Sequence, residues 1–187
     1  MSPNPLPHPL SAPGEPTQST VSAAIPRSPS WPWLWSHPAH FVAAGFGSGL
    51  LRPGPGTWGT VAGWVLFVVL DRWLSDAMWI ALIALTFAIG CWAAQRAGDS
   101  LGRADHGSIV IDEIVAFWIV LLLVPSTLLA QALAFVVFRF FDIVKPPPIG
   151  ALDRRFKNGV GVMIDDLVAA LYTLLLAAVA ARIGLAP

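Results

Sequence analysis

Two adjacent pairs of acidic residues, Asp112-Glu113 and Asp165-Asp166, lie within apolar stretches of this sequence. A charge in such a stretch is costly unless it is paired, solvated or bound to an ion. Neighbouring residues of a helix diverge by about 100°. Within each pair, one carboxylate can therefore face a shared ion while the other meets a second ion or a basic partner. Oxygen ligands from facing helices are typical of Mg²⁺ or Mn²⁺ sites.

The second acidic pair ends a strongly charged segment, Arg139 to Asp166, which also carries Asp142 and Lys145. Three consecutive prolines, 146–148, exclude a helix there and stiffen a basic loop. The helix dipole favours an acid near a helix N-terminus by about 0.3–1 kcal/mol, which explains one such pair. Two pairs with several cations nearby instead indicate a metal-dependent site that acts on phosphate at a membrane surface.

The composition indicates a membrane domain. The 187 residues are 56% hydrophobic and only 12% charged. The 11 basic and 11 acidic residues cancel, so no broad nucleic-acid surface is expected. The single cysteine, Cys91, excludes an internal disulfide and a multi-cysteine metal site. Oligomeric state leaves no signal in these numbers.

The chain divides into a tail and a helical domain. Residues 1–30 are rich in Pro and Ser and nearly uncharged, so they are expected to be disordered. Residues 31–187 are expected to form the membrane-embedded domain. Its first tryptophans, Trp31, Trp33 and Trp35, fit either the membrane interface or packing on the domain.

A glycine-rich segment, Gly45 to Thr60, is expected to be a loop that precedes a helix near Thr60. It matches neither a dinucleotide fingerprint nor a P-loop. Its backbone N–H groups, with Arg52, could bind an anion, although a tight turn explains the glycines equally well.

Continuous apolar runs without period-2 alternation predict an all-α, multi-helix integral membrane bundle. Ala77–Ala94 and Val160–Ala181 are the clearest spans, whereas Val61–Leu74 is short. The apolar sequence 109–141 is interrupted at Pro125, so it is either one kinked span or a hairpin of two half-depth helices. Basic residues flank it on both sides. This favours the hairpin, with both flanks in the cytoplasm.

Four blocks of the sequence resemble the phosphatidylglycerophosphatase A family: GFGSGLLRPGPGTWGT, DHGSIVIDEIVAFWI, FRFFDIVKPPPIGALDRR and NGVGVMIDDLVAALY. The resemblance covers about Phe41 to Tyr172. It implies a Mg²⁺-dependent lipid phosphatase of the bacterial cytoplasmic membrane. Such an enzyme removes the terminal phosphate of phosphatidylglycerophosphate to leave phosphatidylglycerol.

The resemblance and the charge pattern together give the expected site residues. Asp112, Glu113, Asp165 and Asp166 are expected to bind the metal. Asp142 and Lys145 join them as catalytic residues. Substrate contacts are expected from Arg52, Asp105, His106, Arg139 and Arg154. By its position alone, His106 would more simply be a solvated loop residue.

The expected chemistry is metal-assisted attack of water on the phosphomonoester. The sequence has no Asp-x-Asp for an aspartyl-phosphate route and no Ser-Gly-His for a histidine nucleophile. The alternative is a membrane cation transporter or channel that uses intramembrane carboxylates. Acids near helix ends beside a basic loop favour the phosphatase. A scaffold without chemistry would leave the acidic pairs unexplained.

Overall fold

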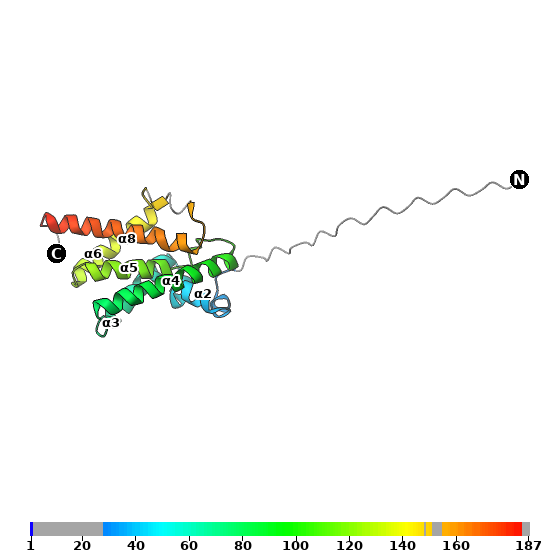
Figure 1. Ribbon diagram of the computed structural model, residues 1–187, viewed down its shortest axis with the longest axis horizontal. Helices are drawn as coiled ribbons and strands as arrows, with labels where there is room; N and C mark the ends of the chain where they lie inside the picture. The colour runs from blue at the N-terminus through cyan, green and yellow to red at the C-terminus, as the bar shows by residue number, and fades with distance from the viewer. Residues whose placement is uncertain (2–27, 148, 151–154, 185–187) are drawn as a thin grey trace.

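The computed structural model describes residues 1, 28–147, 149–150 and 155–184. Within these residues all regular structure is helical, in agreement with the all-α part of the predicted fold class (Figure 1). The elements are α1 Trp31–Trp35, α2 Pro38–Ala43, the 3₁₀ helix η1 Gly45–Leu50, α3 Pro55–Leu70, α4 Asp76–Leu101, α5 Ile111–Leu123, α6 Leu128–Val144 and α8 Gly159–Arg182.

Polar side chains begin three of the long helices. Ser75 caps α4, Thr127 caps α6 and Asn158 caps α8, each by accepting a hydrogen bond from a backbone N–H of the first turn. Gly102, with φ 70°, ends α4 in the left-handed conformation that glycine adopts without strain. These caps fix where the apolar helices start and stop.

The short helix α5 is the centre of the bundle. It contacts α3, α4, α6 and α8, and all but three of its 13 residues are buried. Figure 1 shows it lying between α8 and α4. The close approach of α3 depends on small residues, because a Cβ at Gly59 would collide with Val110 and one at Gly63 would press on Ile114.

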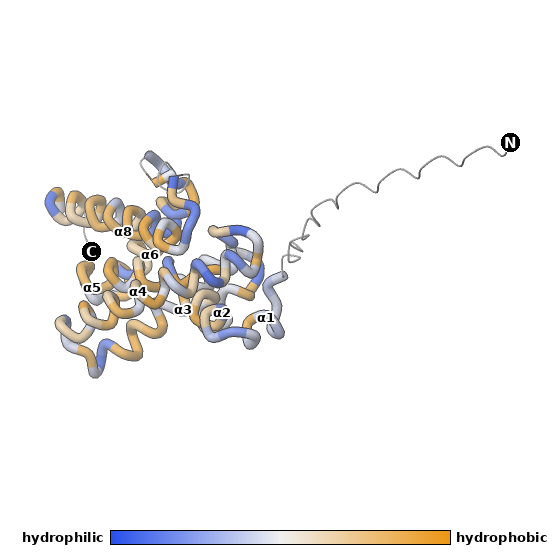
Figure 2. Tube along the Cα trace, turned by 45° about the vertical axis from the view of Figure 1, so that its right-hand side comes forward, coloured by the Kyte–Doolittle hydropathy of each residue, from blue (hydrophilic) through white to orange (hydrophobic). Residues whose placement is uncertain are grey.

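Two helices, α4 and α8, are long and apolar enough to cross a membrane. They contain the two predicted spans. In Figure 2 the helix bodies are largely hydrophobic, and hydrophilic residues gather toward the turns. Large apolar side chains point outward on α4, α6 and α8, among them Ile80, Leu85, Val136, Leu171 and Val179. An apolar solvent is the natural environment for such a surface.

The glycine-rich segment was predicted to be a loop, but parts of it are helical. Its first part forms η1, and α3 begins at Pro55, five residues before the expected start. Proline favours the first turn of a helix because its φ is already set and its missing N–H is not needed there. The extra turn lengthens the apolar helix that looked too short in the sequence.

Helix α4 continues beyond the predicted span Ala77–Ala94, to Leu101. In this added part, Arg96 and Asp99 lie on an exposed face while Ala97 and Leu101 are buried. Ser108 does not cap the next helix, α5. The N-cap position is Val110, which makes no side-chain hydrogen bond.

Of the two roles proposed for the first tryptophans, Trp33 takes the packing role. Trp33 is buried, stacks on His40 with ring centroids 4.5 Å apart, and donates from Nε1 to Ser100 Oγ at 2.7 Å. Trp31 and Trp35 are exposed. Most of the predicted tail, residues 2–27, lies outside the described residues.

Candidate active site at the start of the central helix

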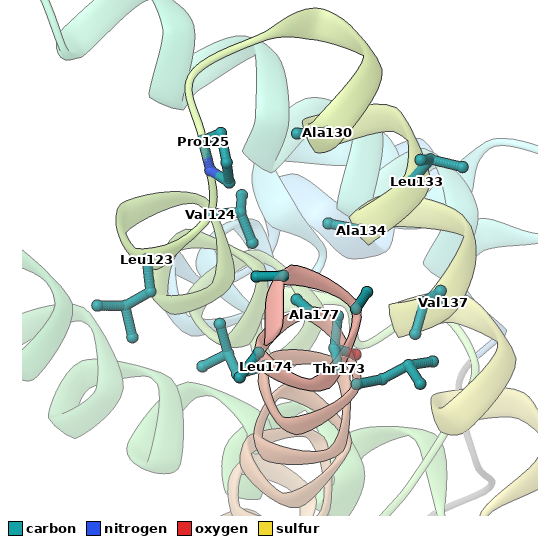
Figure 3. Close-up of a pocket in the computed structure, with 14 residues that line it drawn as sticks. Leu123, Val124, Pro125, Ala130, Leu133, Ala134, Val137, Thr173, Leu174 and Ala177 are labelled. Carbon is teal, nitrogen blue, oxygen red and sulfur yellow. The ribbon is translucent and has the colours of Figure 1, made fainter. Parts of the chain in front are cut away.

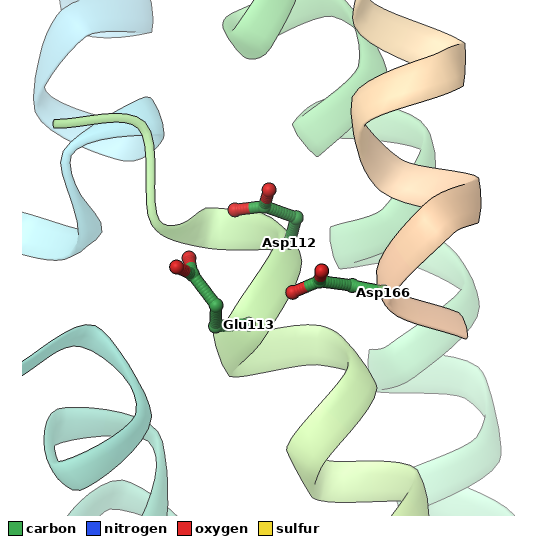
Figure 4. A group of neighbouring side chains, drawn as sticks. All are labelled: Asp112, Glu113 and Asp166. Atoms are coloured by element: carbon green, nitrogen blue, oxygen red, sulfur yellow. The ribbon is translucent and has the colours of Figure 1, made fainter. Parts of the chain in front are cut away.

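Three carboxylates meet where α5 begins. Asp112 and Glu113 project from its first turn and Asp166 from the second turn of α8, as Figure 4 shows. One oxygen of each lies within 4.8 Å of those of the other two. All three residues are buried, with relative exposures of 7%, 8% and 2%. We call these three residues the acidic cluster.

The acidic cluster contains carboxylate oxygens with nothing to bond to. Asp112 Oδ1, Glu113 Oε2 and Asp166 Oδ2 are buried and have no hydrogen-bond partner among the described residues. Buried polar atoms are normally satisfied, and uncompensated negative charges repel one another. A divalent cation bound by oxygen ligands would satisfy both requirements, so this donor set fits Mg²⁺ or a similar hard cation.

Arginine from α6 borders the acidic cluster. Arg139 Nη1 lies 3.4 Å from Glu113 Oε1 and 3.5 Å from Thr60 Oγ1. Its guanidinium also pairs with Asp142, one helical turn further on. Asp142 in turn interacts electrostatically with Glu113 and Asp166. The sequence-predicted residues Arg139 and Asp142 are therefore both part of the site.

Lys145, at the end of α6, forms an ion pair with Asp165, the other acidic residue of α8. Lys145 Nζ lies 2.5 Å from Asp165 Oδ2 and 3.6 Å from Asp105 Oδ2. Asp165, expected as a metal ligand, thus directs one oxygen to a cation, while Asp166 faces the acidic cluster. Lys145 has a φ of 45°, the left-handed conformation, at the position that ends α6.

Two residues of the site carry no charge and were missed in the sequence. A Cβ on Gly56 would collide with Glu113 Oε1 and with the guanidinium of Arg139. Thr60, one turn further along α3, donates to Gly56 O at 2.9 Å and is fully buried. The spacing of small residues at 56, 59, 60 and 63, one helix face, was the available signal.

A basic group lies around His106, whose neighbour Asp105 pairs with Lys145. The ring Nδ1 accepts a hydrogen bond from Ser108 N at 3.1 Å. Partial burial lowers the pKa of His106, and the positive charges of Arg103 and Arg52 lower it further, against the effect of Asp105. The charges of Arg103 and Arg52 therefore act at His106. Arg103 was not predicted, and Arg154 lies outside the described residues.

Comparison with known protein families gives a match over most of the chain. Residues 41–181 match the model of the family described as phosphatidylglycerophosphatase A. The chain belongs to that family. The matched region contains the acidic cluster together with Arg139, Asp142 and Lys145, and the resemblance drawn from the sequence motifs is confirmed.

Named relatives cover most of the chain. The phosphatidylglycerophosphatase A of Haemophilus influenzae is 47% identical over 140 residues, which are 74% of this chain and 86% of that protein. That of Escherichia coli K12 is 40% identical over 135 residues, 72% and 78% of the two chains. A Bacteroides thetaiotaomicron protein, provisionally named a phosphatidylinositol-3-phosphatase, is 38% identical over 146 residues, 74% and 91%. No solved structure matches the chain.

Proposed function

We propose that this protein hydrolyses the terminal phosphomonoester of phosphatidylglycerophosphate and leaves phosphatidylglycerol, a step of phospholipid biosynthesis. The observation that carries the proposal is the acidic cluster, with its unsatisfied buried oxygens beside two cationic side chains. The identity of the substrate is inferred from the two relatives that are named phosphatidylglycerophosphatase A.

Asp112, Glu113 and Asp166 would hold Mg²⁺. When bound there, the ion would polarise a phosphoryl oxygen and lower the pKa of a coordinated water. Asp165 was expected to be a fourth ligand. Because one of its oxygens accepts a hydrogen bond from Lys145, we assign it instead to positioning that ammonium group.

The chain's own residues then act on charge and protons. Arg139, held between Glu113 and Asp142, and Lys145 offset the negative charge on the transferring phosphoryl group. A carboxylate of the site accepts the proton of the attacking water as the new P–O bond forms. The bond from phosphorus to the glycerol oxygen breaks, and that oxygen takes up a proton to become a hydroxyl group.

The basic group of Arg52, Arg103 and His106 fits a second contact. The head group of phosphatidylglycerophosphate carries an internal phosphodiester besides its terminal monoester. Arg52 is exposed at the turn before α3, and its positive charge lowers the pKa of His106. We infer that this group binds the diester, with Asp105 orienting Lys145 between the two anions.

The site is proposed to face the cytoplasm from a multi-pass position in the bacterial inner membrane. Glu113 at the start of α5 meets Arg139 near the end of α6, which supports a chain that turns back at Pro125. Both ends of this hairpin, and the basic residues beside them, would then share one side of the membrane. Cytoplasmic loops are enriched in Lys and Arg.

Phosphate release from phosphatidylglycerophosphate by the purified protein in detergent micelles tests the proposal. Release is expected, is expected to stop on chelation, and is expected to return with added Mg²⁺. Release that persists at full rate in excess chelator would refute the metal site but not the phosphatase. No release under any condition, together with cation flux in liposomes, would favour the transporter.

A further inference from the structure

An apolar cavity of about 620 Å³ opens between the end of α5, the first half of α6 and the last half of α8. Figure 3 shows Leu123, Pro125, Leu133 and Val137 around it, with Leu174 and Ala177 of α8. We call it the α6–α8 groove. Its volume lies within the range of about 300–1,000 Å³ that is usual for small-ligand sites.

The α6–α8 groove offers a ligand almost nothing but hydrocarbon. Thr173 is the one residue with a polar side chain among those that line it. Its hydroxyl donates to Ala169 O at 2.9 Å, inside its own helix. A ligand with polar atoms would lose its hydrogen bonds to water here and gain none, so the groove selects an apolar chain.

The groove is built on the same two helices that carry the site. Along α8, Thr173 comes seven residues after Asp166, and Ala181 comes fifteen residues after it. With the rise per residue of an α-helix, these separations are about 10 and 22 Å. Along α6, Val137 precedes Asp142 by five residues, about 8 Å. One leaflet of a bilayer has a hydrocarbon depth of about 15 Å. Measured along α8, the groove therefore begins within one leaflet's depth of the acidic cluster, where an acyl chain of a lipid bound at the site would reach it.

We propose that the α6–α8 groove binds one acyl chain of the phospholipid substrate while the head group is held at the acidic cluster. The proposal rests on the proposed function and adds to it a determinant of substrate choice. Activity would then depend on the length of the acyl chain as well as on the phosphate-bearing head group.

A second cavity, about 660 Å³, lies on the other side of α5 between α4 and α8. Its lining includes Ala84, Phe87 and Leu122, with the carboxylate residue Asp76 among them. It contains no residue of α6, the helix that supplies Arg139 and Lys145. We therefore assign the substrate chain to the α6–α8 groove, and the second cavity serves as the comparison.

The test compares a long-chain and a short-chain phosphatidylglycerophosphate, measured as kcat/KM in the same micelles. Ala177→Trp fills the groove from α8. Leu133→Trp fills it from α6 at a position that is 49% exposed and so tolerates a larger side chain. Val179→Trp is the matched control, because Val179 is exposed on α8 and does not line the groove.

Both groove variants are expected to lower kcat/KM for the long-chain lipid about tenfold, the effect of no longer burying about two methylene groups of the acyl chain. The short-chain lipid should be hydrolysed as in the wild type, and Val179→Trp should change neither value. Equal losses for both lipids, or no loss for either, would overturn the proposal. A further variant, Ala84→Trp, fills the second cavity. An effect of acyl-chain length seen only in this variant would also overturn the proposal. If wild type hydrolyses neither lipid, the proposed function fails and takes this inference with it.

Discussion

Lys145 Nζ lies 2.5 Å from Asp165 Oδ2, in an ion pair that joins the end of α6 to the second turn of α8. The neighbouring carboxylate, Asp166, belongs to the acidic cluster instead. Two adjacent and chemically identical side chains thus have different environments, because successive residues of a helix point in different directions. They are expected to differ in function as well.

Neutral substitutions of the two aspartates should separate these functions. Asp166→Asn removes the charge of a proposed metal ligand, so activity should fall more than about 100-fold and the Mg²⁺ concentration for half-maximal rate should rise. Asp165→Asn weakens the ion pair with Lys145, which keeps Asp105 as a partner, so kcat should fall about 10- to 100-fold with little change in Mg²⁺ requirement. Rates measured across a Mg²⁺ titration distinguish the two outcomes.

Asp112→Asn and Glu113→Gln are expected to behave like Asp166→Asn. All of these variants should be extracted from membranes in wild-type yield, because the substitutions keep side-chain shape. Near-normal turnover in any two of the three cluster variants at saturating Mg²⁺ would show that the cluster is not the metal site.

The approach of Gly56 to Glu113 gives a prediction that does not depend on a charge. Gly56→Ala places a methyl group against Glu113 Oε1 and the guanidinium of Arg139, so one of them must move. A displacement of about 1 Å at a reacting site can cost about 100-fold in rate, and kcat should fall accordingly. Gly107→Ala is the control, because a Cβ there meets nothing within 4 Å. Equal activity of the two variants would mean that the contact has no catalytic importance.

The charged residues of the site could be found in the sequence, because acids and cations stand out in apolar segments. The partners of those residues could not. Whether Asp165 or Asp166 faces Lys145 depends on how α8 is rotated against α6, which local sequence does not determine. Gly56 and Thr60 were missed because they carry no charge, and their importance lies in the space between α3 and Arg139.

The helix boundaries illustrate a second limit. The predicted span ended at Ala94, where polar residues begin, yet α4 persists to Leu101 because Ala97 and Leu101 are buried by tertiary contacts. Conversely, the break at Pro125 was visible because proline cannot continue a helix. The local sequence was therefore sufficient to predict where a proline ends a helix, but insufficient to predict which face of a helix is buried.

The proposed hairpin at Pro125 predicts the accessibility of three single cysteines in a Cys91→Ala background. Arg96→Cys and Lys157→Cys lie at exposed positions on the two flanks, and Ser126→Cys lies at the exposed turn. Both flank probes should react with a membrane-impermeant thiol reagent from the cytoplasmic side only, and Ser126→Cys should not react from that side. Labelling of the two flank probes from opposite sides would exclude the hairpin.

Head-group selectivity is the final prediction, and it concerns the basic group around His106. Phosphatidylglycerophosphate presents a monoester and a diester, whereas phosphatidic acid presents one phosphate. A charge-assisted hydrogen bond to the diester, at about 1.5–3 kcal/mol, gives roughly a ten- to hundredfold preference in kcat/KM. Arg52→Ala should remove most of this preference by lowering the value for phosphatidylglycerophosphate alone, as measured with both lipids in mixed micelles.

A spectroscopic measurement tests the same neighbourhood without turnover. Because the charge of Arg52 lowers the pKa of His106, Arg52→Ala should raise that pKa toward its ordinary value. An NMR titration of ring-labelled histidine in detergent would detect the shift, with His106→Gln to assign the signal and Arg155→Ala as the control cation. A raised pKa with unchanged selectivity would remove Arg52 from head-group binding while leaving it beside His106. Equal kcat/KM values for the two lipids in the wild type would refute the second contact altogether.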